Sequence, residues 1–306
     1  MGRILCLLYH RVNNVRDQLY NLTVSPEEFD QHIKYLRENY RTVRFDENWN
    51  LISEDAIAIT FDDGYADNYV YALPVLERYK VPATIFVSTG NIGTSREFWW
   101  DDIERVLTSQ KCYPSRFCLH DALYEYTWET VSEFQRQELA KTLRWLLRME
   151  PNDVCFKAWI KQLKTWAGVK SDEGRVGYRS LDKEQLKKLA RSPYITIGAH
   201  TVSHLSLGAL SKEMQEKEIG DSIHYLEKEL GYNITIFSYP FGSKMDYNAD
   251  TLEICKKLGI TKAATTNAKL WTEQDEPYLI PRFAVKNGSM DVFVKQIENF
   301  FNGCLL

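Results

Sequence analysis

The stretch from Ala56 to Gly64 constrains the fold of this chain more than any other. It reads Ala-Ile-Ala-Ile-Thr-Phe-Asp-Asp-Gly, an apolar run that ends in two carboxylates and a glycine. A short apolar run that is rich in β-branched residues and closed by a turn signal is typical of a buried strand. The sequence therefore predicts that Asp62 and Asp63 lie at the carboxyl end of a strand, where α/β folds gather ligands and catalytic groups.

A second apolar run, from Tyr194 to Ala199, ends in two histidines, His200 and His204. Residues four apart share one face of a helical turn, so we expect both imidazoles to point the same way. Two histidines and one carboxylate leave an open position on zinc or a similar divalent ion, as catalytic sites require. The histidine pair and the aspartate pair, each at a strand end, together predict a metal centre.

These two motifs resemble those of the polysaccharide deacetylase family, which has a NodB-type domain. A third stretch, Phe-Ser-Tyr-Pro-Phe-Gly at residues 237–242, resembles the third motif of that family. The resemblance covers most of residues 1–90 and 190–300. It implies that Asp62 is the general base. It also implies a divalent metal, for which we predict zinc, held by Asp63, His200 and His204.

The third motif contains one group that the family resemblance leads us to expect, and it differs from the family pattern at one position. By resemblance, the backbone N–H of Phe241 helps to hold an oxyanion. Many members of the family carry an arginine in this motif that steadies the base, and here that place is taken by Ser238. We expect Arg282, which emerges from the final predicted strand (Tyr278 to Val285), to replace it; the alternative is an ordinary surface arginine.

The catalytic acid is a second departure. Many members supply it from a late histidine, but no histidine follows His224 here. Leu-Leu-Tyr-His-Arg-Val at residues 7–12 resembles the N-terminal strand of the poly-N-acetylglucosamine deacetylases, which supply the acid histidine from this position. The resemblance implies that His10 protonates the leaving amine. The alternative is a core histidine that is hydrogen-bonded to the backbone.

Apolar runs alternate with helical patterns along most of the chain, which favours a parallel α/β arrangement. The resemblance implies a distorted seven-stranded (β/α) barrel forming one NodB-type domain over residues 1–306. Between about residues 94 and 180 we find helical periodicity and no convincing strand, so we expect an inserted helical subdomain. The predicted barrel strands begin at Ile4, Ala56, Ala83, Tyr194, Ile234, Lys262 and Leu279.

Composition narrows the class of protein. The chain has 306 residues, 44% of them hydrophobic, and a net charge of −4, which argues against a general nucleic-acid binder. The opening apolar run, Ile4 to Tyr9, is too short for a secretion signal or a spanning helix. The six cysteines form no Cys-x-x-Cys pair. We therefore expect reduced thiols and a cytoplasmic location.

The predicted insert is strongly basic. Residues 136–191 hold fourteen Lys and Arg against seven Asp and Glu. Basic residues and tryptophans at helical spacing are typical of helices that lie on anionic membranes, so this region predicts peripheral contact with such a membrane or with a lipid-linked glycan. The alternative is a solvated basic face opposite a packed tryptophan face. Trp99 and Trp100 form either a stacking wall for a sugar or part of the core of the insert.

The function that these residues predict is hydrolysis of an amide on an acetamido sugar or glycan precursor, with an N-formyl substrate as a variant. One alternative is a different amide or imide hydrolase on the same scaffold. The other is a non-catalytic carbohydrate-binding protein, which would not need the base Asp62. The sequence predicts neither the particular sugar nor the oligomeric state.

Overall fold

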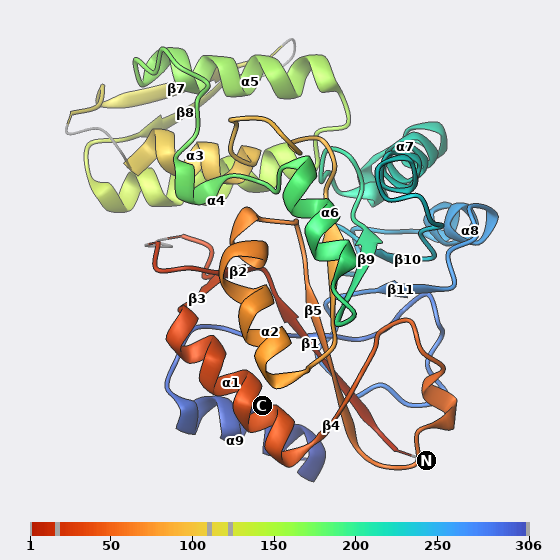
Figure 1. The fold of residues 1–306 in the computed structure, drawn as a ribbon. Helices are drawn as coiled ribbons and strands as arrows, with labels where there is room; N and C mark the ends of the chain where they lie inside the picture. The colour runs from red at the N-terminus through yellow and green to blue at the C-terminus, as the bar shows by residue number, and fades with distance from the viewer. Residues whose placement is uncertain (1, 16–18, 109–111, 122–124, 304–306) are drawn as a thin grey trace.

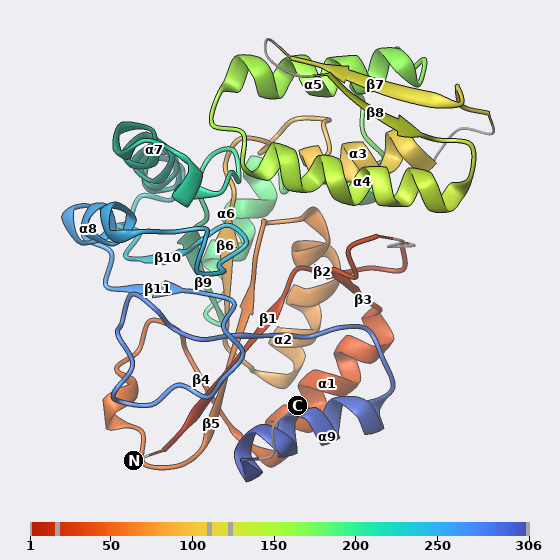
Figure 2. The ribbon, with the colours of Figure 1, turned by 180° about the vertical axis from the view of Figure 1, so that it is seen from behind.

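A curved parallel sheet forms the centre of the molecule (Figures 1 and 2). The computed structural model describes residues 2–15, 19–108, 112–121 and 125–303. The main strands run in the spatial order β11-β10-β9-β6-β5-β1-β12. This arrangement confirms the expected incomplete barrel of seven parallel strands. Those strands are β1 (Ile4–Tyr9), β5 (Ala56–Phe61), β6 (Ala83–Val87), β9 (Ile195–Ala199), β10 (Ile236–Ser238), β11 (Lys262–Ala264) and β12 (Phe283–Ala284).

The strand β5 lies in the middle of this sheet. One edge pairs with β1 along its whole length, while the other pairs first with the short strand β4 (Arg41–Val43) and then with β6. Every residue of β1 and β5 is buried. Parallel strands that are covered on both faces are continuous apolar runs, which is why the sequence predicted both strands without alternation. The carboxyl end of β5 therefore opens into the centre of the barrel face.

The last strand is shorter than the predicted run from Tyr278 to Val285. Only Phe283–Ala284 is a strand, and it pairs with β1. Pro281 has no N–H to donate to a ladder, so regular pairing starts only after it. Before the proline, Ile280 forms a single parallel bridge to Ala264. The gap between β11 and β12 is therefore closed by isolated contacts.

Helices cover the outside of the sheet (Figures 1 and 2). A π-helix at Asn68–Ala72 precedes α2, and Pro74 lies in the first turn of α2. The first and last helices lie side by side in both views (Figures 1 and 2). The covering helices are α1 (Pro26–Asn39), α2 (Leu73–Tyr79), α6 (Lys183–Arg191), α7 (Lys212–Leu230), α8 (Ala249–Lys257) and α9 (Met290–Asn302).

The region predicted as an insert lies over the carboxyl ends of the barrel strands (Figure 1). It contains the helices α3 (Trp99–Thr108), α4 (Glu133–Arg148) and α5 (Asp153–Trp166). The prediction that it has no strand was wrong. The strands β7 (Arg116–His120) and β8 (Glu125–Glu129) form an antiparallel hairpin. Phe117 and Leu119 alternate with exposed or half-buried residues, a period of two typical of a half-buried strand.

The insert has an apolar core of its own, separate from the barrel core. The tryptophan face of α5 packs into this core rather than onto the barrel: Trp159 is 7% and Leu163 is 2% exposed. Within the described residues, no helix combines the length and apolar character needed to cross a bilayer. The described cysteines form no disulfide, and Cys304 lies outside the described residues. The remaining members of the insert core include Ile103, Leu107, Leu139, Leu143 and Leu147.

Candidate active site

Three predicted metal ligands meet at the carboxyl face of the barrel. Asp63 follows β5, while His200 and His204 follow β9. The Oδ1 atom of Asp63 lies 3.2 Å from Nε2 of His204 and 3.6 Å from Nε2 of His200. One donor atom from each residue falls within 4.8 Å of the others, and all three side chains are buried. Two ligands about 2.1 Å from a shared tetrahedral zinc would lie roughly 3.4 Å apart, so these separations fit one ion.

The surroundings of the three donors also fit a cation. Asp63 Oδ1 is buried without a hydrogen-bond partner among the described residues, which is costly for a carboxylate unless a cation is bound. His200 Nδ1 lies 2.7 Å from the carbonyl oxygen of Ser238. A carbonyl only accepts, so Nδ1 carries the proton and Nε2 presents its lone pair to an ion.

The two histidines do not lie on a helical turn, so that prediction was wrong. Residues 200–204 form a loop in which Thr201 and His204 have positive φ angles of 63° and 54°. The Thr201 hydroxyl accepts a hydrogen bond from the His204 N–H at 3.1 Å. Asp63 and Phe241 also have positive φ. Left-handed conformations are unfavourable for such residues, and they cluster at functional sites.

Asp62 is held by the arginine expected to replace the family residue. Arg282 donates from Nη1 to Oδ1 and from Nη2 to Oδ2 of Asp62, each at 2.7 Å. Ser238 completes the group: its hydroxyl accepts from Arg282 Nη2 at 2.7 Å and lies 3.2 Å from Asp62 Oδ2. Arg282 is fully buried, which excludes the alternative of a surface arginine.

Electrostatics keep both aspartates ionised. Burial raises the pKa of Asp62, but the Arg282 guanidinium and His200 outweigh it, so the pKa lies below the ordinary value. Burial also opposes ionisation of Asp63, and interactions with His200 and His204 bring its pKa far below that value. An ionised Asp63 is the form that a metal needs as a ligand. An ionised Asp62 is the form that can accept a proton.

The backbone N–H of Phe241 is available as a donor. It makes no hydrogen bond to any of the described residues, whereas the following N–H, of Gly242, donates to the Pro240 carbonyl at 2.7 Å. The Phe241 ring lies 4.8 Å from the His204 ring, measured between centroids. Unpaired N–H groups beside a metal centre are suited to stabilising a developing oxyanion.

His10 follows β1, at the same end of the barrel. Its side chain is half-buried, and its carbonyl oxygen accepts from Asn68 Nδ2 at 2.9 Å. Burial lowers the pKa of His10, and the nearby carboxylates of Asp63 and Asp62 partly oppose that shift. His10 therefore belongs to the same electrostatic cluster as the two aspartates.

The two tryptophans at the start of α3 differ in their contacts. Trp100 is buried: its ring lies 4.4 Å from the His204 ring, and its Nε1 donates to the Tyr65 hydroxyl at 2.9 Å. Trp99 is half-buried and lies 6.4 Å from the Phe241 ring. The insert therefore lines the candidate site through both residues.

Sequence reasoning missed a link between α4 and the loop of the third motif. Arg148 Nε donates to Oδ1 of the buried Asp246 at 2.8 Å, and the guanidinium carbon lies 4.2 Å from the centre of the Phe241 ring. The Arg148 carbonyl accepts from the Ser206 N–H, two residues after His204. The partners are far apart in sequence, and no local pattern marks Arg148 as anything but a basic residue near the end of a helix.

The sequence profile described as polysaccharide deacetylase matches residues 52–149 and 156–263. The chain belongs to the polysaccharide deacetylase family. Deacetylases of this family are metal-dependent and act on polysaccharides that carry acetamido sugars.

Individual relatives are distant and match over nearly the whole chain. YxkH of Bacillus subtilis, a proposed polysaccharide deacetylase, is 25% identical over 96% of this chain and 75% of its own length. The poly-β-1,6-N-acetyl-D-glucosamine N-deacetylase of Staphylococcus aureus is 21% identical over 97% of this chain and 83% of its own.

Solved structures share the fold. Deacetylase PplD of Streptococcus pyogenes, solved with acetate, has a TM-score of 0.60 at 20% identity and covers 96% of this chain and 97% of its own. IcaB from Ammonifex degensii has a TM-score of 0.62 at 19% identity, with 97% of each chain covered. At this identity the likeness concerns the barrel architecture alone.

Proposed function

We propose that this protein is a metal-dependent hydrolase that removes an N-acetyl group, or the smaller N-formyl group, from an amino sugar in a glycan. One observation carries the proposal. The carboxylate of Asp62, oriented by both nitrogens of the Arg282 fork, lies beside a buried three-residue ligand set. A protein that only binds carbohydrate would have no need of a buried, ionised and oriented carboxylate at this point.

The residues divide the work of amide hydrolysis. Asp63, His200 and His204 would hold the divalent ion, with zinc as the predicted identity. Such an ion supplies Lewis acidity, which makes water acidic near neutral pH and polarises a carbonyl group. Asp62 accepts the proton from the attacking water, and Arg282 keeps its oxygens in place for that transfer.

The remaining groups act on the substrate. The Phe241 N–H donates to the oxygen of the scissile carbonyl as negative charge develops on it. His10, in its protonated form, donates a proton to the sugar nitrogen as the carbon–nitrogen bond breaks, because an amine anion is too poor a leaving group to depart unprotonated. Acetate and a glucosamine-type amine are the expected products.

The test measures acetate and metal together. Purified protein would be analysed for bound zinc, cobalt, nickel and manganese, and acetate release would be followed with β-1,6- and β-1,4-linked N-acetylglucosamine oligomers. The relative from Staphylococcus aureus makes the β-1,6-linked oligomer the first substrate to try. Acetate release that tracks metal content supports the proposal. Carbohydrate binding with no acetate released at full metal occupancy would overturn it in favour of a binding protein.

The cytoplasmic location expected from the sequence remains a proposal, tested by fractionating the cells that make the protein. Peripheral membrane contact also remains a proposal, and a vesicle-binding measurement below bears on it.

A further inference from the structure

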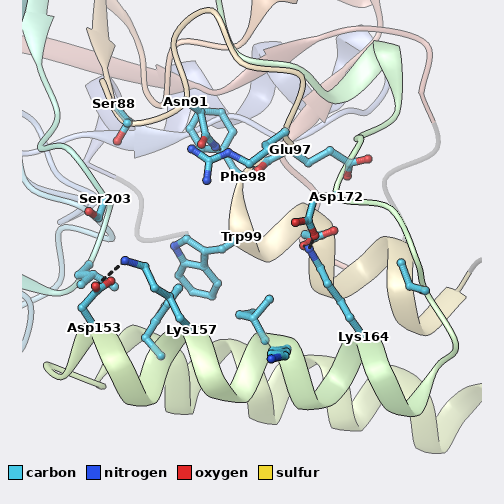
Figure 3. A pocket seen from close by; sticks show the side chains of 18 of the residues that line it. Ser88, Asn91, Glu97, Phe98, Trp99, Asp153, Lys157, Lys164, Asp172 and Ser203 are labelled. Atoms are coloured by element: carbon cyan, nitrogen blue, oxygen red, sulfur yellow. Dashed lines mark hydrogen bonds and ion pairs between the residues drawn. The ribbon is translucent and has the colours of Figure 1, made fainter.

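We propose that the cavity between α5 and the loops after β6 and β9 is a subsite for an anionic group of the substrate, a phosphate or a carboxylate. The group would be carried by a sugar next to the one that loses its acetyl group, so this inference rests on the proposed function. The cavity has a volume of about 730 Å³ and is shown in Figure 3. Nothing in the catalytic scheme above uses it.

The cavity and the metal centre share a wall. Val202, Ser203 and Leu205, which flank the ligand His204, all line the cavity. In the loop after the neighbouring strand β6, Ser88 also lines the cavity, and its hydroxyl donates to the carbonyl oxygen of His200 at 2.9 Å. A ligand in the cavity therefore lies against the backbone that carries both histidine ligands.

Trp99 joins the two spaces. It lines the cavity opposite α5 (Figure 3), where its ring lies 5.7 Å from that of Phe156. The same ring lies 6.4 Å from Phe241, whose N–H belongs to the candidate site. The indole N–H of Trp99 is buried and has no hydrogen-bond partner among the described residues. An aromatic wall with a few polar groups is the common composition of a ligand site.

The carboxylates that line the cavity are all neutralised. Glu97 pairs with Arg175 at 2.8 Å. Asp172 pairs with Lys164 at 2.7 Å. Asp102 pairs with Arg105 and also lies beside Lys164. The fourth carboxylate, that of Asp153, pairs with Lys157 one helical turn further along α5.

Three cationic side chains that line the cavity are not paired with a carboxylate among the described residues. Lys161, Lys170 and Arg96 line the cavity and form no ion pair within 4.0 Å in the described part of the chain. All three are exposed at its rim. A cleft with excess charge of one sign concentrates ligands of the opposite sign. A chain with a net charge of −4 thus presents a positive rim beside its candidate metal centre.

The structure favours a glycan over a membrane as the anionic ligand. A helix that lies on a bilayer needs its apolar face free to enter the lipid. On α5 that face is buried within the insert, at Trp159 and Leu163. The lysine face lines a cavity with an aromatic back wall instead of an open surface. A sugar chain that bears a phosphate or a carboxylate can fill such a space.

Binding rather than turnover tests this inference. The Asp62→Asn protein, loaded with metal, would be titrated by calorimetry with three oligosaccharides of equal length. Chitotetraose is neutral, a hyaluronan tetrasaccharide carries carboxylates, and 6-phosphorylated chitotetraose carries a phosphate. We expect at least one charged ligand to bind about tenfold more tightly than the neutral one, and high salt to reduce that ratio. The ligand that shows the preference identifies the anion.

Matched variants locate the effect. Lys161→Glu combined with Lys170→Glu is expected to bring the ratio close to one. Lys295→Glu reverses a single charge on the exposed face of α9, outside the residues that line the cavity, and should keep the ratio. Equal affinity for neutral and charged ligands, or an equal loss with Lys295→Glu, would overturn the subsite. So would salt-sensitive binding to phosphatidylglycerol vesicles with no preference among the oligosaccharides, which would favour the membrane.

The two proposals can fail separately. A charge preference that depends on Lys161 and Lys170, in a protein that releases no acetate, would leave the subsite standing and remove the deacetylase. Acetate release with no preference for charged ligands would leave the deacetylase standing and remove the subsite.

Discussion

Asp62 and Asp63 are neighbours in the sequence but have different surroundings. Asp62 lies against Arg282 and Ser238, whereas Asp63 faces the two histidines. Adjacent side chains of a regular strand point to opposite faces. Here the chain turns instead, with φ of 74° at Asp63 and 78° at Gly64. A Cβ atom at Gly64 would also meet Val87 Cγ1 at 2.9 Å, so glycine is required at this turn.

Arg282→Met is expected to move the acidic limb of the pH profile. The guanidinium favours the ionised form of Asp62, so its loss should raise the pKa of that carboxyl. Because the base acts when deprotonated, activity should then be lost at a higher pH than in the unchanged protein. The measurement is kcat/KM against pH. Arg282→Lys should lie between the two, because it keeps the charge without the fork. If the acidic limb of the pH profile were unchanged in Arg282→Met, Arg282 would not be the group that lowers the pKa of Asp62.

His10→Ala is expected to separate two kinds of substrate. An amine leaving group needs a proton and a phenolate does not, so the variant should slow N-acetyl cleavage far more than cleavage of an activated acetyl ester. General-acid loss on the amide is expected to cost about 10²–10⁴-fold. The comparison uses both substrates with protein of equal metal content. Equal losses on the two would show that His10 is structural.

At the scale of elements, the end of α4 joins the two loops that carry the site. Arg148 bonds Asp246 in the third-motif loop and receives the Ser206 N–H from the histidine loop. Asp246 Oδ2 in turn accepts the Ser243 N–H at 2.8 Å, two residues beyond Phe241. The insert is therefore linked by hydrogen bonds to the loop that carries the Phe241 N–H.

Arg148→Met is expected to lower kcat by up to about 10²-fold with little change in metal content, since a small misplacement of a catalytic group costs that much. Arg136→Met is the matched control. It lies on the same helix, but among the described residues it contacts Tyr113, Thr130 and Val131, away from the site. Equal kcat values for both variants and the unchanged protein would contradict the positioning role.

The elements that the sequence predicted best are those with a signal in their own residues. β1 and β5 are continuous apolar runs, so the chemistry of their own residues sets their bounds. The hairpin β7–β8 was missed because its alternation of apolar residues spans only five residues per strand. The histidine loop was misjudged because Thr201 and His204 adopt positive φ, which residue spacing cannot predict.

At the scale of the whole molecule, metal removal is expected to destabilise the fold. An ion that binds only the folded chain adds stability, about 4 kcal/mol when present at ~1,000 times its dissociation constant. Chelation should therefore lower the melting temperature of the unchanged protein. His204→Ala, which lacks a ligand, should melt at the same temperature with and without the ion. If the unchanged protein melted at the same temperature with and without the chelator, that result would contradict a bound structural or catalytic ion.

The placement of the insert is the part of the whole that the sequence did not predict. Its basic residues predicted a membrane contact from their spacing alone. In the structure Arg148 reaches Asp246, and Lys161 and Lys170 line the cavity beside the metal centre. Arg148 and Asp246 are 98 residues apart in the sequence. The surface that a helix packs against is decided by how well the helix and that surface fit each other. Hydrophobic periodicity shows which face of a helix is apolar but does not predict this fit.

A paired measurement on two variants distinguishes Asp62 as the base from Asp63 as a metal ligand. Metal content and acetate release would be measured on the same samples of Asp62→Asn and Asp63→Asn. We predict that Asp62→Asn keeps its metal and loses about 10²–10⁴-fold in turnover, while Asp63→Asn loses both its metal and its turnover. Metal lost from Asp62→Asn, with activity following occupancy, would contradict it, as would an Asp62→Asn protein that keeps full turnover.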